Sequence, residues 1–198
     1  MNKMYTIKHN LVALLTIIFT GVVGTYLVYQ NSSSPTVPSF VKAAASEPEV
    51  KTDSQISSDG IYEIVMQTTI NKDKTKTYIF NVTSKADNST QTILTQTVPE
   101  GDSFSIPFNT FSPKDKYLFL IQTIQGKNHY LVFNSSGKVF TENQTSIDIT
   151  PLFEKEKPDL VLKNVTGWAS ETVLICQTSG PSFWFELPGH FIQLSTRF

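Results

Sequence analysis

The chain has 198 residues, which is enough for one ordinary domain with additional segments. Its formal net charge of -1 at pH 7 argues against a nucleic-acid-binding protein, because such proteins usually present a strongly basic surface. The single cysteine, Cys176, excludes an internal disulfide, so the fold must depend on its core. We expect Cys176 to be a small buried hydrophobic residue, with a reactive or intermolecular thiol as the alternative.

An uncharged apolar segment lies near the amino terminus, at residues 11–29. As a helix rising about 1.5 Å per residue, it would cross the roughly 30 Å hydrocarbon core of a bilayer. Lys3 and Lys8 precede this segment, whereas the next charged residue after it is Lys42. The positive-inside rule therefore predicts a cytoplasmic amino terminus at residues 1–10 and an extracytoplasmic remainder. We predict a single-pass protein of the cell membrane, with a cleaved signal peptide as the alternative.

A linker is predicted at residues 30–59, which are rich in Ser, Pro, Thr, Ala and acidic residues. Such a segment cannot bury enough apolar surface to offset the entropy lost on ordering, so we expect a disordered stalk. An extracytoplasmic β-repeat domain then occupies residues 60–198.

Three similar apolar strands in this domain each end in Gln-Thr, and their glutamines are 55 residues apart. These strands are predicted at 62–68, 117–123 and 172–178. A polar turn and an aromatic strand follow each of them, at 77–82, 129–134 and 182–187. A third strand is predicted in each repeat, at 92–96, 138–141 and 191–194. No amphipathic helix is expected from residue 61 onward.

The segment Phe111–Phe119 reads Phe-Ser-Pro-Lys-Asp-Lys-Tyr-Leu-Phe and resembles the F-S-P-D-G-K-Y-L-A-F signature of TolB-like, WD40-like β-propeller repeats. Residues 167–174 look like a diverged copy, and a period near fifty residues is typical of propeller blades. The resemblance implies an all-β fold with three propeller-blade-like antiparallel sheets after one amino-terminal transmembrane helix. Because propellers close with about 4–8 blades, three form only a partial propeller, and a β-sandwich is the alternative.

Residues with catalytic or metal-binding potential are sparse. His9, His129 and His190 show no spacing of a zinc site, and no nucleophile elbow or Gly-rich phosphate loop occurs. We therefore predict no enzyme, no cofactor and no metal site. Glu186, on an aromatic strand, is the most unusual carboxylate, and we expect its side chain to point outward.

Aromatic residues gather in the last repeat and form the candidate interaction surface: Trp168, Phe183, Trp184 and Phe185. The alternative is that they pack between sheets. These features predict a membrane-tethered extracytoplasmic binding or scaffolding module of the cell envelope, which self-associates or binds another envelope protein. A hydrolase acting on envelope polysaccharide, or a subunit of a sensor or secretion assembly, is the alternative.

Overall fold

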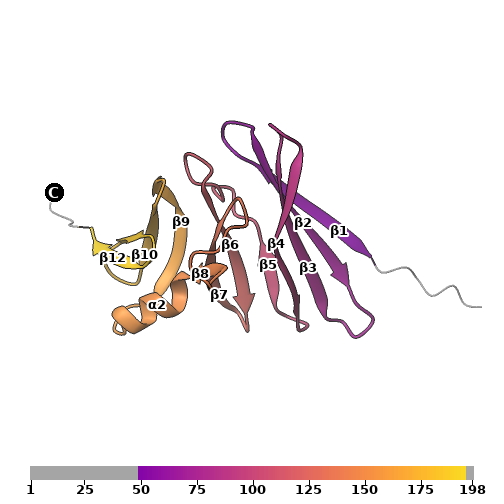
Figure 1. The fold of residues 1–198 in the computed structure, drawn as a ribbon. Helices are drawn as coiled ribbons and strands as arrows, with labels where there is room; N and C mark the ends of the chain where they lie inside the picture. Colours follow the sequence, from indigo (N-terminus) through magenta and orange to yellow (C-terminus); the bar gives the residue numbers. More distant parts are fainter. Residues whose placement is uncertain (1–48, 195–198) are drawn as a thin grey trace, which may run out of the picture. The chain divides into compact units, whose positions relative to one another are not determined.

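The computed structural model describes residues 49–194, which form three four-stranded antiparallel sheets and one short helix (Figure 1). The prediction of an all-β fold is therefore confirmed for this part of the chain. The predicted segments at 1–10 and 11–29, and most of the linker, lie outside the described residues. Between residues 49 and 194, no helix has the length and apolar character needed to cross a membrane.

Each sheet is a meander in which consecutive strands pair with one another. Sheet 1 consists of β1 (Val50–Ile56), β2 (Tyr62–Ile70), β3 (Lys76–Ser84) and β4 (Ser89–Val98). Sheet 2 consists of β5 (Ser103–Ser105), β6 (Tyr117–Ile124), β7 (Lys127–Asn134) and β8 (Ser146–Asp148). Sheet 3 consists of β9 (Leu162–Ser170), β10 (Val173–Thr178), β11 (Phe183–Glu186) and β12 (His190–Gln193).

Strand β1 lies inside the range 30–59 for which the sequence predicts a linker, so the folded unit begins before residue 60. Nearly all of its side chains are exposed, which explains why no apolar alternation marks it as a strand. Its order comes from main-chain pairing with β2, which runs from Val50 opposite Thr69 to Ile56 opposite Glu63. Each sheet thus has a first strand ahead of the three that the sequence predicts.

Sheet 2 departs from the predicted pattern at its last strand. Residues 138–141 form a loop with only an isolated bridge between Thr141 and Gln144, and the strand lies instead at β8. An unexpected helix follows, α2 (Ile149–Glu156), whose N-cap Asp148 accepts a hydrogen bond from the Thr150 N–H at 3.0 Å. The helix has about two turns and buries only Ile149, Thr150 and Phe153. Its apolar pattern is therefore too short for periodicity to distinguish a helix from a strand.

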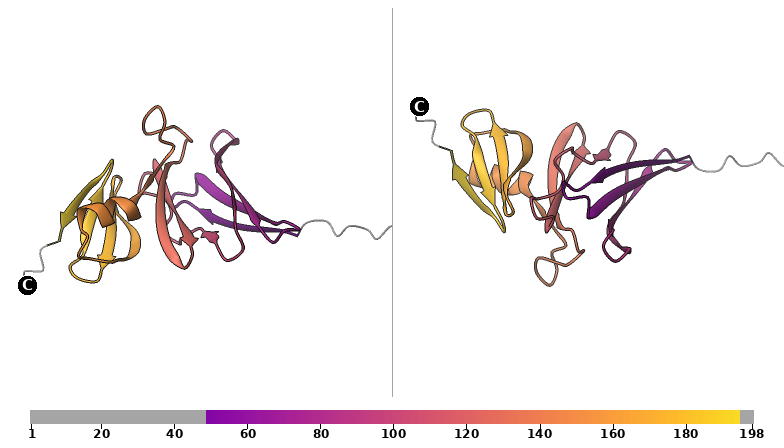
Figure 2. Two further views of the ribbon diagram at one scale, coloured as in Figure 1. Left: turned by 90° about the horizontal axis from the view of Figure 1, so that it is seen from below. Right: turned by 90° about the horizontal axis from the view of Figure 1, so that it is seen from above.

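The core lies between the sheets, and sheet 2 buries both of its faces. Leu118 and Leu120 pack toward the apolar side chains of sheet 1, whereas Phe119 and Val132 pack toward sheet 3 and α2. All four side chains are 0% exposed. Sheet 2 lies between the other two sheets in both views of Figure 2. Burial on both faces explains why β6 is a continuous apolar run instead of an alternating one.

Replacing Phe119 by alanine should lower the free energy of unfolding by about 3–5 kcal/mol, because the cavity would open between two sheets. Val139, which is 50% exposed, is the control, and Val139→Ala should change stability by less than about 0.5 kcal/mol. Denaturant unfolding of the two full-length variants measures the difference. Equal unfolding midpoints would show that the contact between sheets 2 and 3 contributes little.

Candidate functional site

Two turns with the same hydrogen bonds precede β2 and β6. The Ser57 N–H donates to the Tyr62 carbonyl at 2.9 Å, and the Tyr62 N–H donates to Ser57 Oγ at 2.9 Å. The Ser112 and Tyr117 pair makes the same two bonds, at 2.9 and 3.0 Å. The first copy was not predicted from the sequence, because Ser57 lies in the range 30–59 that is predicted as a linker. The sequence feature that could have revealed this turn is a Ser followed by a Tyr five residues later, which occurs at Ser57 and again 55 residues further on.

A carboxylate from sheet 3 connects its turn to the turn of sheet 2. Glu171 Oε1 accepts hydrogen bonds from Ser112 Oγ at 2.8 Å and from the Lys116 N–H at 3.0 Å. Its other oxygen, Oε2, accepts from the Lys114 N–H at 2.6 Å. Hydrogen bonds to a charged acceptor are about twice as strong as neutral ones, so Glu171 fixes sheet 3 against sheet 2 at this end.

Asp115 occupies the position in the second turn that Gly60 occupies in the first, and both have a left-handed backbone, with φ of +57° and +76°. The Asp115 side chain is only 3% exposed, and its Oδ1 has no hydrogen-bond partner in the described part of the chain. Burial, together with the neighbouring Asp59 carboxylate, raises the pKa of Asp115 to about 6. The Ile61 N–H and the Ser57 hydroxyl lower the pKa of Asp59, which therefore keeps the charge.

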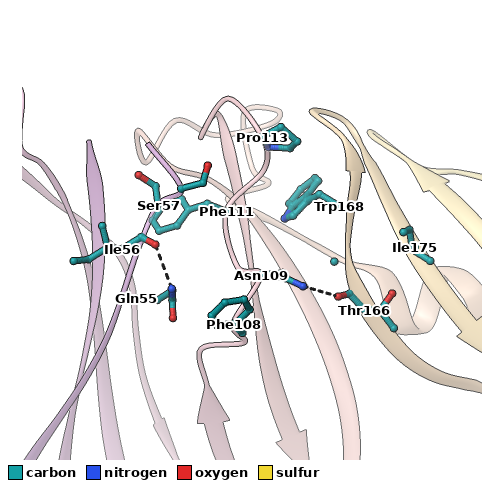
Figure 3. A pocket seen from close by; sticks show the side chains of 12 residues that line it. Gln55, Ile56, Ser57, Phe108, Asn109, Phe111, Pro113, Thr166, Trp168 and Ile175 are labelled. Atoms are coloured by element: carbon teal, nitrogen blue, oxygen red, sulfur yellow. Dashed lines mark hydrogen bonds between the residues drawn. The ribbon is translucent and has the colours of Figure 1, made fainter. Parts of the chain in front are cut away.

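A groove of about 520 Å³ lies close to these turns, where the first strands of the three sheets approach one another (Figure 3). Twelve residues line it: Gln55, Ile56, Ser57, Ser58, Phe108, Asn109, Phe111, Pro113, Thr166, Gly167, Trp168 and Ile175. None of these twelve residues carries an ionisable side chain. Aromatic and aliphatic side chains alternate with hydroxyl and amide groups, so the groove is neutral and amphipathic.

An interruption in the first strand of sheet 2 forms one wall of the groove. Ser105 pairs with Ile121, and Phe111 pairs with Leu118, so five residues on one strand lie opposite two on the other. The extra residues bulge out of the sheet, which leaves Phe108 83% exposed. An aromatic ring this exposed on a folded domain is available to a ligand.

The opposite wall comes from β9. The Trp168 Nε1–H donates to the Thr110 carbonyl at 3.1 Å, which fixes the indole ring between sheets 2 and 3. Asn109 Nδ2 donates to the Thr166 carbonyl at 3.3 Å. Gly167 has a φ of +143°, and a Cβ there would lie 3.1 Å from the Asn109 Cβ. A side chain at position 167 would therefore press on the wall of the groove.

The structure separates the four aromatic residues of the candidate interaction surface. Phe183 and Phe185 are 1% and 0% exposed and belong to the core beside α2. Trp168 is half-buried and lines the groove, where its ring lies edge-on to Phe119 with centroids 6.2 Å apart. Trp184 is 40% exposed and faces the opposite side of β11 from Phe183 and Phe185. Trp168 and Trp184 are therefore the two with accessible surface.

The other residues considered from the sequence do not converge. Cys176 is buried, and burial raises the pKa of its thiol to about 12, as expected of a core residue. His129 Nδ1 lies 2.8 Å from Asp148 Oδ2, at the start of α2. Glu186 is paired across strands with His190 in sheet 3, and neither residue lines the groove. Among residues 49–194, no group of three or more His, Cys, Asp or Glu side chains is arranged to hold a metal ion.

Comparison with known proteins returns no match for this chain, whether with family models, curated proteins or solved structures. The resemblance of Phe111–Phe119 to TolB-like and WD40-like repeats therefore stays a prediction.

The pKa of Asp115 predicts a pH dependence of stability. Because the folded pKa, about 6, lies above the ordinary value of 3.8, the folded state binds this proton more tightly than the unfolded chain does. The stability that this proton contributes is complete below about pH 4 and is lost as the pH rises through about 6, by at most about 3 kcal/mol.

Asp115→Asn should therefore be more stable than the wild type at neutral pH, with the advantage vanishing toward acid pH. Asparagine mimics the protonated carboxyl and tolerates the left-handed backbone. Thermal melting of both proteins across this pH range measures the effect. Asp73→Asn is the control: the pKa of Asp73 is lowered by the Thr75 hydroxyl and N–H, so its loss should not stabilise the protein at neutral pH. A parallel pH profile for Asp115→Asn and the wild type would contradict the assignment.

Proposed function

We propose that this chain is a membrane-tethered, extracytoplasmic binding module of the cell envelope, and that the groove is its ligand-binding site. The observation that carries the proposal is the composition of the groove, in which the exposed Phe108 ring and the half-buried Trp168 ring lie beside uncharged hydrogen-bonding groups. The volume of about 520 Å³ falls in the usual range of ligand sites. The uncharged segment at residues 11–29 supports the tether, and the lysines before it support the orientation.

The three sheets are, in this proposal, blades of a partial β-propeller of the TolB-like or WD40-like kind. Three observations support it. Each sheet is a four-stranded meander, the sheets pack face to face, and the turn before the second strand has the same hydrogen bonds in sheets 1 and 2. The groove lies along the first strands, which in a propeller surround the central channel.

An uncharged saccharide is the ligand class that best fits the groove. The apolar face of a sugar ring packs on an exposed aromatic ring such as Phe108, and its hydroxyl groups bond to amides such as Gln55 and Asn109. A charged ligand would lose hydration without gaining an ion pair here. Binding is favoured over hydrolysis of the same polymers, because glycoside hydrolysis commonly needs a pair of carboxyl groups and the lining residues include none.

Phe108→Ala should weaken binding of purified envelope polysaccharide about tenfold, because it removes the most exposed aromatic ring of the groove. Calorimetric titration of the full-length protein with fractionated polysaccharide measures the change. Val139→Ala, an exposed apolar residue outside the groove, should bind like the wild type. Undiminished binding by Phe108→Ala would place the site elsewhere.

The predicted orientation in the membrane can be tested separately from the groove. Protease added to intact spheroplasts should degrade the domain, because residues 60–198 are expected outside the membrane. The measurement is an immunoblot for the carboxyl-terminal part before and after lysis. Protection of the domain until lysis would reverse the orientation while leaving the groove proposal unaffected.

A further inference from the structure

One backbone hydrogen bond recurs in all three sheets, between the residue just before the second strand and the residue just after the third strand. Counting from this bond shows which faces of the three sheets are equivalent. The bond joins Lys85 N to Ile61 O, Ser135 N to Lys116 O, and Leu187 N to Thr172 O. Three residues further along the hairpin, the equivalent cross-strand pairs are Ile64–Val82, Phe119–Val132 and Ile175–Trp184. The first two pairs are at most 2% exposed, because the next sheet covers them.

Sheet 3 also has apolar side chains on this face, but no other sheet within residues 49–194 covers them. Ile175 is half-buried and Trp184 is 40% exposed, and Ile192, which pairs with Trp184, is 45% exposed. The three side chains form a row across β10, β11 and β12. Val173 lies on the same side of β10, and the polar side chains of Gln177, Glu186 and His190 lie around these apolar residues. We call the row together with Val173 the open face of sheet 3.

The outer face of sheet 1, at the other end, carries the apolar residues Val50, Ile56, Val65 and Ile79 but is otherwise polar. Its β3 and β4 side chains form three cross-strand hydrogen bonds: Thr77 with Thr97 at 2.9 Å, Thr92 with Asn81 at 2.7 Å, and Thr83 with Thr90 at 3.0 Å. Polar outer faces of this kind terminate stacked repeats and keep them soluble. Sheet 1 therefore ends the stack, whereas the open face of sheet 3 continues it.

We propose that the open face of sheet 3 packs against the same face of a second copy of this chain, about a two-fold axis. The covering surface must be an apolar sheet face, and within residues 49–194 the open face of sheet 3 is itself such a surface. Head-to-tail closure of two copies into a ring would instead place Trp184 on the hydroxyl pairs of sheet 1. A two-fold contact is self-complementary, because each copy presents the same residues to the other.

The size of the face sets the strength expected of the contact. Three strands about 4.8 Å apart, with about four to six residues of 3.3 Å each, cover at most about 300 Å², compared with about 800 Å² per partner in a standard interface. The dimer should therefore dissociate on dilution. Confinement to a membrane, if the proposed tether is right, raises the effective concentration and favours the dimer.

Cross-linking of the full-length protein in its membrane tests the geometry. Ile192→Cys should give a covalent dimer with a short bis-maleimide, whereas Thr95→Cys, exposed on the outer face of sheet 1, should not. The native Cys176 is buried and should not react. Co-expressed Ile192→Cys and Thr95→Cys chains distinguish the two arrangements, because a mixed product would show head-to-tail contact and overturn the proposal.

The mass of the detergent-solubilised protein gives an independent test by light scattering over a concentration series. The wild type should shift from monomer to dimer as concentration rises, and Trp184→Asp should stay monomeric with an unchanged circular dichroism spectrum. Val139→Asp, which adds the same charge outside the face, should dimerise like the wild type. A wild type that is monomeric at every concentration, or a Trp184→Asp variant that still dimerises, would overturn the proposal. If Trp184→Asp fails to fold, the wild-type series and the cross-linking still decide the question.

Discussion

The structure depends on the burial of sheet 2 on both of its faces. Phe119 and Leu120 are neighbours in β6, yet they point into different cores, one shared with sheet 3 and the other with sheet 1. A single sheet with one covered face would leave half of β6 in water, so the three sheets are stable only as a stack. The chain has no disulfide to supplement this packing, because Cys176 is its only cysteine.

The turns at one end of the stack add polar contacts to this apolar packing. Every described hydrogen bond of the Glu171 carboxylate goes to the turn of sheet 2, and these bonds add to the ones that Trp168 and Asn109 make between sheets 2 and 3. Asp115 lowers the stability of the fold when it is charged, because its carboxyl group is buried beside Asp59 and its Oδ1 has no hydrogen-bond partner in the described part of the chain. A buried group of this kind costs stability unless it is protonated, so the contact between sheets 1 and 2 weakens as the pH rises through about 6.

The groove and the open face of sheet 3 follow from the same stacking. The bulge between Ser105 and Phe111 interrupts the first strand of sheet 2 and exposes Phe108 beside β9. Gly167, which has no side chain, is the cross-strand partner of Ile175 in sheet 3. The Ile175 side chain is therefore not covered by its neighbour on β9, and it lines the groove as well as belonging to the open face. A ligand in the groove and a second copy on sheet 3 would therefore touch neighbouring surfaces.

The sequence by itself determined the strand type and the core role of Cys176, because apolar runs and turn residues are local signals. Its 55-residue spacing holds from sheet 1 to sheet 2, but the equivalent backbone hydrogen bond lies 56 residues further on in sheet 3, at Thr172 instead of Glu171. The sequence did not reveal β1, whose exposed side chains carry no pattern and whose order comes from pairing with β2. Only the structure shows that Trp184 is exposed while its neighbours Phe183 and Phe185 are buried. The alternation of side chains along a strand places them on opposite faces of the sheet, but it does not tell which face another sheet covers. The groove and the Asp59–Asp115 contact also arose only in three dimensions, since they join residues about 50 or more positions apart that meet when the sheets stack.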